Sequence, residues 1–152
     1  MSKSYIQYII LFFSIISFAQ QKAKVIKIKD GDTIVVLDSL NFQRTLRLAE
    51  VDCPEKKQPF GTVAKQYTSN LVFGKNITYI QTDTDRYGRT IAKVYINNKY
   101  LSEEIIKAGM GWWYYKYSTN QYLGELQSEA KRNKIGLWVD ANPIAPWNWR
   151  KK

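Results

Sequence analysis

The sequence contains no histidine and a single cysteine, Cys53, among its 152 residues. Without histidine the protein has no imidazole to act as a general base, to carry a phosphoryl group or to complete the usual zinc sites. One cysteine excludes an internal disulfide and a metal site built from several thiolates. The fold must therefore rely on its hydrophobic core rather than on covalent cross-links.

Negative charge is also scarce, because 23 Lys and Arg residues face 13 Asp and Glu residues, which gives a net charge of +10. An excess of this size favours a polyanionic partner, such as nucleic acid, anionic lipid or acidic polysaccharide. A protein that binds membrane surfaces would use a basic amphipathic helix, and residues 20–152 contain no such pattern. The charge therefore favours nucleic acid or another soluble polyanion.

Long hydrophobic runs are absent apart from one at the N-terminus, between Tyr8 and Phe18, which is too short to span a membrane comfortably. The run follows Lys3 and ends in Ser17-Phe18-Ala19, with small residues at the two positions that signal peptidase reads. We therefore expect residues 1–19 to be a secretory signal peptide, with an uncleaved anchor as the alternative. Residues 20–152 would then form one secreted or periplasmic domain without stable membrane association.

Five short runs of alternating or β-branched residues predict β-strands. The runs are Lys24–Asp30, Thr33–Leu37, Phe42–Ala49, Asn76–Thr82 and Ile91–Ile96. Between the third and the fourth, Val63, Tyr67 and Leu71 recur at helical spacing. This spacing predicts a helix over Thr62–Phe73 that buries these three side chains.

Two more helices are expected after the last strand. The first would be capped by Ser102 and ended by Gly109, and the second would begin after Asn120 and end at Gly136. The tail from Asp140 to Lys152 is expected to form an ordered strap packed on the barrel. Five strands with a helix between the third and the fourth is the order of an OB-type barrel. The predicted fold class is therefore α+β, a five-stranded OB-fold β-barrel with three α-helices.

The stretch from Arg47 to Glu55 concentrates charge at the end of a predicted strand. Leu46 and Leu48 fall on one face of that strand and Arg47 on the other, and Pro54 is expected to stop the strand. Carboxylates gathered at a strand end offer hard oxygen ligands to a divalent cation, and an adjacent arginine suits a phosphate. Structural ion pairs at strand ends are an equally common explanation of such a cluster.

Two other turns favour phosphoryl chemistry over that explanation. Asp30-Gly31-Asp32-Thr33 adds an acid that the tight turn itself does not require, and Asp85-Arg86-Tyr87-Gly88-Arg89 adds two arginines and a tyrosine. Together with the Arg47–Glu55 stretch, these motifs resemble the staphylococcal nuclease (thermonuclease) family in residue type, order and approximate spacing. The resemblance runs from about Lys24 to about Trp138, and it implies that residues 20–152 form a nuclease domain of this type.

The resemblance implies a calcium ion as the cofactor. Asp32 and Asp52 would bind the ion through their carboxylates, and Cys53 would bind it through its main-chain carbonyl. The family usually has threonine at the position of Cys53, and this departure should matter little because the main chain provides the ligand. Calcium accepts such a mixed set of oxygen ligands.

The resemblance also implies the roles of the remaining site residues. Glu55 would orient or deprotonate the attacking water, and Arg47 and Arg89 would stabilise the charge that develops on the phosphoryl oxygens. Arg86 and Tyr87 match residues that hold the neighbouring phosphate, and the family usually has lysine where Arg86 stands. The substrate would be DNA or RNA, and we expect the protein to act as a monomer.

An aromatic segment, Trp112-Trp113-Tyr114-Tyr115-Lys116-Tyr117, is open to two interpretations. It can pack within the protein, or it can form a platform on which bases stack. By the resemblance, Tyr115 and Tyr117 match two tyrosines that line the nucleotide site. The alternative function is an OB-fold module that binds single strands without cutting them. Such a module gains nothing from Asp32, Asp52 and Glu55 near a phosphate, so the acids favour an enzyme.

Overall fold

The computed structural model describes residues 19–151. The predicted signal peptide therefore lies outside the described residues, apart from Ala19. In the described part of the chain, no helix combines the length and the apolar character needed to cross a membrane.

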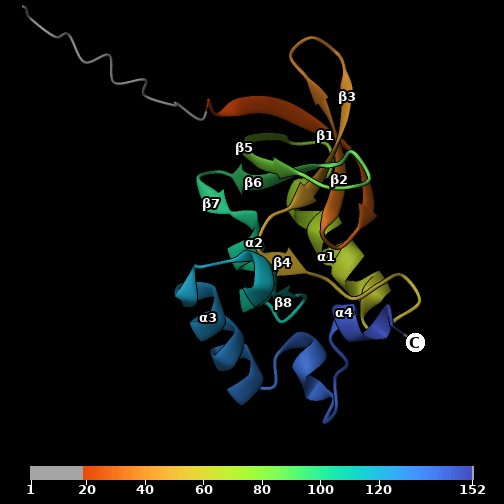
Figure 1. Ribbon diagram of the computed structural model, residues 1–152, viewed down its shortest axis with the longest axis vertical. Helices are drawn as coiled ribbons and strands as arrows, with labels where there is room; N and C mark the ends of the chain where they lie inside the picture. Colours follow the sequence, from red (N-terminus) through yellow and green to blue (C-terminus); the bar gives the residue numbers. More distant parts are fainter. Residues whose placement is uncertain (1–18, 152) are drawn as a thin grey trace, which may run out of the picture.

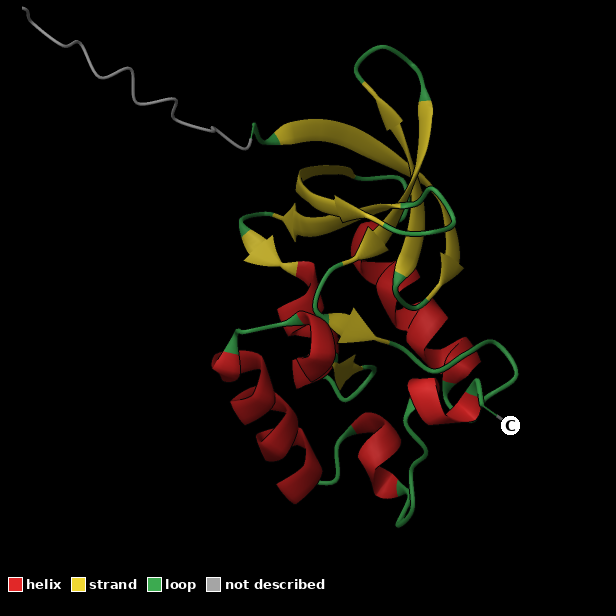
Figure 2. Ribbon diagram, in the orientation of Figure 1, coloured by secondary structure: helices red, strands yellow, loops and turns green. Residues whose placement is uncertain are grey.

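A five-stranded barrel forms one half of the molecule (Figures 1 and 2). Its strands are β1 (Gln21–Asp30), β2 (Thr33–Asp38), β3 (Gln43–Leu48), β5 (Asn76–Thr84) and β6 (Thr90–Ile96). They pair in the order β3-β2-β1-β5-β6, and a parallel pairing of β3 with β6 closes the ring. This closure confirms the predicted OB-type barrel. The short strand β7 (Lys99–Tyr100) extends the β6 edge after the Asn97-Asn98 turn, in which both residues have positive φ.

The barrel interior is filled by aliphatic side chains that alternate along its strands. Val25, Ile34, Val36, Leu46 and Val94 are all fully buried. In β1 the alternation is interrupted, because a bulge between Val25 and Lys27 places Val25 and Ile28 inside and leaves Ile26 only half-buried. A bulge of this kind increases the local twist and helps a sheet to curve into a barrel.

The helices lie mainly below the barrel, as Figure 2 shows. They are α1 (Gly61–Val72), α2 (Leu101–Lys107), α3 (Gln121–Arg132) and the short α4 (Pro146–Trp149), with 3₁₀ turns η1 (Tyr115–Tyr117) and η2 (Gly136–Val139). A two-stranded ribbon of β4 (Val51–Asp52) and β8 (Trp112–Trp113) lies among them. The three helices predicted from the sequence are present, and α4 is an addition that the pattern did not predict.

The buried face of α1 differs from the predicted one. Ala64, Thr68 and Val72 are buried, whereas Val63 is 48% exposed. The reason is a close approach to the β1–β2 turn, where the Thr68 hydroxyl donates to the Gly31 carbonyl at 2.6 Å. Small side chains are needed at this contact, so the helix turns its small residues rather than its largest ones toward the turn.

Two predicted helix ends were also wrong. Ser102 does not cap α2 but lies buried within it and donates its hydroxyl to the Ala49 carbonyl at 2.7 Å. Helix α3 ends at Arg132, before Gly136, which has a φ of +59° and begins η2 instead. In both cases a tertiary contact or a second turn outweighed a residue preference that is purely local.

Candidate active site

The pairing of β3 brings the three sequence motifs together. Thr33 of β2 lies opposite Arg47 in the antiparallel register, and Ile91 of β6 lies opposite the same Arg47 in the parallel register. The β1–β2 turn and the β5–β6 loop therefore meet at the same end of β3. They border a cavity of about 880 Å³. The segment that follows β3 also lines this cavity.

Most residues predicted for the site line this one cavity. They are Asp32, Arg47, Asp52, Cys53, Glu55, Arg86, Tyr87, Arg89 and Tyr117, and the lining also includes Tyr114 and Arg150. Tyr115 is not among the lining residues. The topology of the barrel thus assembles in space what the sequence presents as separate turns.

Asp32 is held in place by the backbone around it. Its Oδ2 accepts a hydrogen bond from the Cys53 N–H at 2.6 Å, its Oδ1 accepts one from the Thr33 hydroxyl at 3.0 Å, and the residue is 6% exposed. Gly31 permits this contact, since a Cβ there would lie 2.8 Å from the Cβ of Cys53 and 3.0 Å from that of Ala64. Glycine is therefore required by close approach, which the turn signal alone did not indicate.

Arg47 is bound on several sides. Its Nη1 donates to the carbonyls of Leu48 at 2.8 Å and Val51 at 2.7 Å, and its Nη2 lies 2.8 Å from Asp52 Oδ1 and 3.4 Å from Asp32 Oδ2. Burial acts to lower the pKa of the guanidinium, but the two carboxylates outweigh it and raise that pKa. The side chain is therefore a fixed positive charge at the floor of the cavity.

Asp52 lies on the separate short strand β4 and is 1% exposed, whereas the sequence predicted that it stands at the end of the strand that contains Arg47. The chain makes an extra turn first, at Glu50, whose φ is +66°, and then β4 pairs with β8. Burial raises the pKa of Asp52, and hydrogen bonds from Arg150 and the charge of Arg47 oppose that rise. Glu55, on the loop that follows, is half-buried at the edge of the same cavity.

The β5–β6 loop is organised by Asp85. The carboxylate of Asp85 accepts hydrogen bonds from the backbone N–H groups of Tyr87 and Arg89, and Arg89 Nε lies 2.6 Å from its Oδ2. The Tyr87 ring is contacted by the guanidinium groups of Arg86 at 4.9 Å and Arg89 at 5.6 Å from its centroid. The loop thus presents two cations and an exposed aromatic ring to the cavity.

Some side chains of the aromatic segment pack within the protein, and others line the cavity. Tyr114 stacks on Trp147 of α4, with ring centroids 5.4 Å apart and planes inclined by 2°. Tyr115 contacts Trp113 and Trp147 edge-on and is 51% exposed, whereas Tyr117 is 73% exposed and lines the cavity. The structure therefore places Tyr117 at the predicted substrate surface and leaves Tyr115 beside the tail.

Sequence reasoning missed Arg150, which follows α4 and contacts the acids of the cavity. Its Nη2 lies 2.8 Å from Asp52 Oδ2, and its Nη1 lies 2.7 Å from Glu55 Oε1. The tail was expected to pack on the barrel. Instead, the ring of Trp147 in the tail contacts the rings of Trp112, Tyr114 and Tyr115, beside the helices. The only sequence signal was the basic character of the tail, which did not indicate a partner.

The acids offer a partial match to a metal site. Across residues 19–151, no three Asp, Glu, Cys or His side chains are grouped closely enough to hold a metal ion. The set implied by the resemblance is smaller, with two carboxylates and a main-chain carbonyl. Asp32 and Asp52 do converge, because both lie within 3.4 Å of Arg47 Nη2. Calcium prefers oxygen ligands, so the two carboxylates and the Cys53 carbonyl are of the chemical kind that can hold it.

Comparisons with known proteins agree with the motifs. Residues 45–140 match the family model described as "Staphylococcal nuclease homologue". A Haemophilus influenzae protein named "Uncharacterized endonuclease" is 40% identical over 95% of this chain and 83% of its own length. An Escherichia coli O157:H7 protein of the same name is 38% identical over 99% of both chains. "Micrococcal nuclease" of Shigella flexneri is 35% identical over 94% of this chain and 88% of its own length. The chain therefore belongs to the staphylococcal nuclease family.

Proposed function

We propose that the protein is a calcium-dependent nuclease that hydrolyses phosphodiester bonds in DNA or RNA. Hydrolysis of phosphodiester bonds is supported by membership of the family and by relatives whose names describe nucleases. The observation that carries the proposal is one cavity that holds Asp32, Asp52 and Glu55 beside Arg47 and Arg89. Acids repel a phosphate, so their presence in the cavity of a basic protein is explained by catalysis and not by binding.

Membership of the family and the shared cavity support a role for each side chain. Glu55 holds and orients the attacking water and accepts its proton as the bond from the water oxygen to phosphorus forms. The bond from phosphorus to the leaving sugar oxygen breaks in the same displacement, and that oxygen takes a proton from solvent. Arg47 and Arg89 stabilise the charge that builds on the phosphoryl oxygens. The Nη atoms of Arg47 already donate to Leu48, Val51 and Asp52, so Arg47 acts through its fixed charge, whereas Arg89 can also donate hydrogen bonds to the phosphate. Arg86 and Tyr87, which line the cavity from the β5–β6 loop, hold the adjacent phosphate of the strand.

Calcium, when bound by Asp32, Asp52 and the Cys53 carbonyl, would polarise the phosphate as a Lewis acid. Cys53 itself is a neutral packing residue, because burial raises the pKa of its thiol well above the ordinary value. The main-chain carbonyl is thus the group of Cys53 that is suited to the metal. Threonine or cysteine would serve equally at this position.

The protein is also proposed to be exported and to act as a monomer. The basis for export is the sequence of residues 1–19, and we expect the mature chain to begin at Gln20. Sequencing the N-terminus of the protein recovered outside the cytoplasm measures this directly. A product that still begins at Met1 would show that the segment is an uncleaved anchor.

The decisive experiment incubates the purified protein with plasmid DNA and with total RNA, with calcium or with a chelator. Cleavage that requires calcium and is lost in Glu55→Gln is the expected result. Binding without cleavage under every metal condition would favour the alternative, an OB-fold module for single strands. The same gel, run with DNA and RNA in parallel, also reveals which nucleic acid is preferred.

A further inference from the structure

Arg150 forms a three-point contact with the acids to which the proposed function assigns metal binding and water activation. Its Nη1 and Nη2 lie 3.3 Å and 2.8 Å from the two carboxylate oxygens of Asp52, and its Nη1 lies 2.7 Å from Glu55 Oε1. The contact joins residues 98 positions apart in the sequence. It is a bidentate guanidinium–carboxylate pair with an additional acceptor, which is among the stronger ion-pair geometries.

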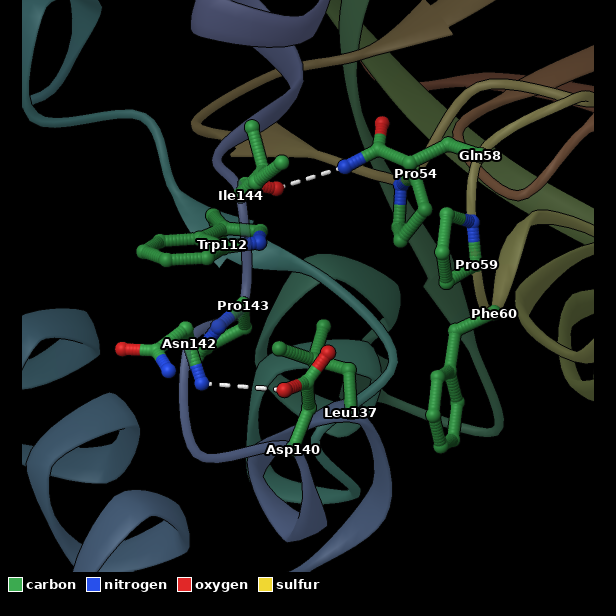
Figure 3. A pocket seen from close by; sticks show the side chains of 10 residues that line it. All are labelled: Pro54, Gln58, Pro59, Phe60, Trp112, Leu137, Asp140, Asn142, Pro143 and Ile144. Carbon is green, nitrogen blue, oxygen red and sulfur yellow. Dashed lines mark hydrogen bonds between the residues drawn. The ribbon is translucent and has the colours of Figure 1, made fainter.

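The tail that carries Arg150 is anchored independently of this contact. The Trp147 ring stacks on Tyr114 and meets Trp112 edge-on at 5.7 Å. Upstream, the Gln58 side-chain amide donates to the Ile144 carbonyl at 2.5 Å, across a small cavity of about 50 Å³ (Figure 3). The Arg150 N–H then donates to the Pro146 carbonyl at 3.0 Å. These contacts hold α4 beside Asp52 and Glu55. The guanidinium of Arg150 therefore has a high effective concentration relative to these two carboxylates.

The contact conflicts with metal binding. Arg47 Nη2 and the two Arg150 nitrogens together engage both oxygens of Asp52. A calcium ion on the same carboxylate would need those oxygens and would repel the guanidinium, whereas Arg47 is fixed by backbone carbonyls and stays in place. The Arg150 side chain is 41% exposed, so it can swing into solvent, and the Arg47 side chain, at 12%, cannot do so easily.

We propose that Arg150 is a tethered cation that competes with calcium for Asp52 and Glu55, so that metal binding and docking of Arg150 exclude each other. The inference rests on the proposed function, because it assumes that calcium binds Asp52. It makes the calcium requirement of the enzyme depend on its own tail.

The test is calorimetric titration of calcium into the full-length mature chain, without substrate. If Asp52 is free of Arg150 in about one molecule in ten to one in a hundred, the apparent calcium Kd is raised about tenfold to a hundredfold. Arg150→Gln should lower the Kd by that factor. The matched control is Lys151→Gln, which removes the same charge from the next, exposed residue and should change the Kd by less than about twofold.

A second readout is the midpoint of thermal unfolding, Tm, measured with and without calcium. Arg150→Gln should lower Tm in chelator, because Asp52 loses a partner, and the deficit should shrink as calcium is added. Arg150→Lys keeps the charge but loses the bidentate geometry, and its Kd should fall between those of Arg150→Gln and the wild type. This variant also serves if Arg150→Gln folds poorly.

The possible outcomes separate the two proposals. Equal calcium Kd values for Arg150→Gln and Lys151→Gln would overturn the competition while leaving the proposed function intact. An Arg150→Gln enzyme with unchanged calcium affinity and a large loss of kcat at saturating calcium would also overturn it, and would place Arg150 on the substrate. A wild-type protein that neither binds calcium nor needs it for cleavage would instead refute the proposed function.

Discussion

Arg47 and Arg89 line the same cavity, but their surroundings differ. Arg47 lies in the barrel wall, its side chain is 12% exposed, and it is bonded to two backbone carbonyls and two carboxylates. Arg89 ends a surface loop, its side chain is 33% exposed, and the ion pair that holds it is with Asp85 of the same loop. The first arginine is therefore part of the architecture, and the second is positioned by one short loop.

This difference separates two properties that a catalytic arginine can have. A buried guanidinium is oriented before substrate arrives, so no free energy is spent to order it. A guanidinium on a loop is easier to replace without harm to the fold, but its geometry depends on its neighbours. Substitutions at the two sites should therefore affect turnover alike and stability differently.

The largest expected effect is on stability at Arg47. Arg47→Ala leaves the carboxylates of Asp32 and Asp52 buried without this partner, and removing one member of a buried ion pair typically costs about 3–5 kcal/mol. Arg89→Ala breaks a partly exposed pair, which is worth about 0–1 kcal/mol. Urea unfolding of both variants without calcium measures the difference. Equal losses would show that Arg47 has no structural role.

Turnover should respond to lysine at either position. Lysine keeps the charge but not the planar guanidinium. At position 89 it cannot donate two parallel hydrogen bonds, and at position 47 it cannot be held by both the Leu48 and Val51 carbonyls in the same place. Loss of one transition-state donor typically costs about 10²–10³ in kcat. We expect Arg47→Lys and Arg89→Lys each to lower kcat on that scale, corrected for the folded fraction, while substrate affinity changes little. Steady-state kinetics on a defined oligonucleotide at saturating calcium measures both.

The control for these two variants is Arg44→Lys. Arg44 is on β3 as well, but its side chain is 49% exposed and pairs with Asp38, outside the cavity. Its turnover should be close to that of the wild type. If Arg47→Lys and Arg89→Lys also keep near-normal kcat, the two arginines act as steering charges and their catalytic assignment is wrong.

Much of the site could be predicted from the sequence, because its motifs are local. Asp32 lies in a tight turn, Arg47 alternates with buried leucines, and Arg89 ends a loop between two strands. The contact between Arg150 and Asp52 could not be predicted, because it crosses 98 positions and leaves no periodic signal. Tyr115 was placed at the cavity by resemblance, and the stacking of Trp147 on Tyr114 was not foreseeable from composition.

The buried face of α1 illustrates the same limit. Hydrophobic spacing favoured Val63, but Val63 is exposed and Ala64 is buried against the Gly31 turn. Spacing predicts that a helix has an apolar face, whereas the choice between adjacent residues depends on the shape of the surface it meets. The barrel was easier to predict because alternation in a strand allows only two faces.

A smaller effect on turnover is expected at Asp85, which positions Arg89. Burial acts to raise the pKa of Asp85, but hydrogen bonds from Arg89 and Tyr87 outweigh it and lower the pKa below its ordinary value of 3.8. A lowered folded-state pKa means that the contribution of this contact is fully present above the unfolded pKa of about 3.8 and is lost only as the pH falls through the lower folded-state pKa. Protonation of Asp85 therefore does not limit activity near neutral pH.

Asp85→Asn keeps the size of the side chain but removes the charge that orients Arg89. We expect kcat to fall by about tenfold to a hundredfold, since misplacement of a catalytic group by about 1 Å can cost 10²-fold. Combining it with Arg89→Lys should add little, because both variants disturb one clamp. Fully additive losses in the double variant would contradict a positioning role.

The smallest effect, and the one that contrasts most with the arginines, is expected from the lysines of β1. Lys22, Lys24, Lys27 and Lys29 are exposed along this strand, which leads to Asp30 at the cavity. Such charges bind phosphates by releasing counterions, so binding should weaken steeply with salt.

In an inactive Glu55→Gln background, replacing Lys24 and Lys27 by Gln should reduce the slope of log affinity against log salt by about 2. The matched control replaces Lys99 on β7 and Lys107 on α2, which are also exposed but lie on other elements. In the active enzyme, neither pair of substitutions should change kcat at saturating substrate, because none of these four lysines donates to the reacting phosphate.

A slope that falls equally for both pairs would mean that only net charge matters and that the nucleic-acid strand does not follow β1. An affinity that is flat with salt in the parent variant would refute the electrostatic account altogether.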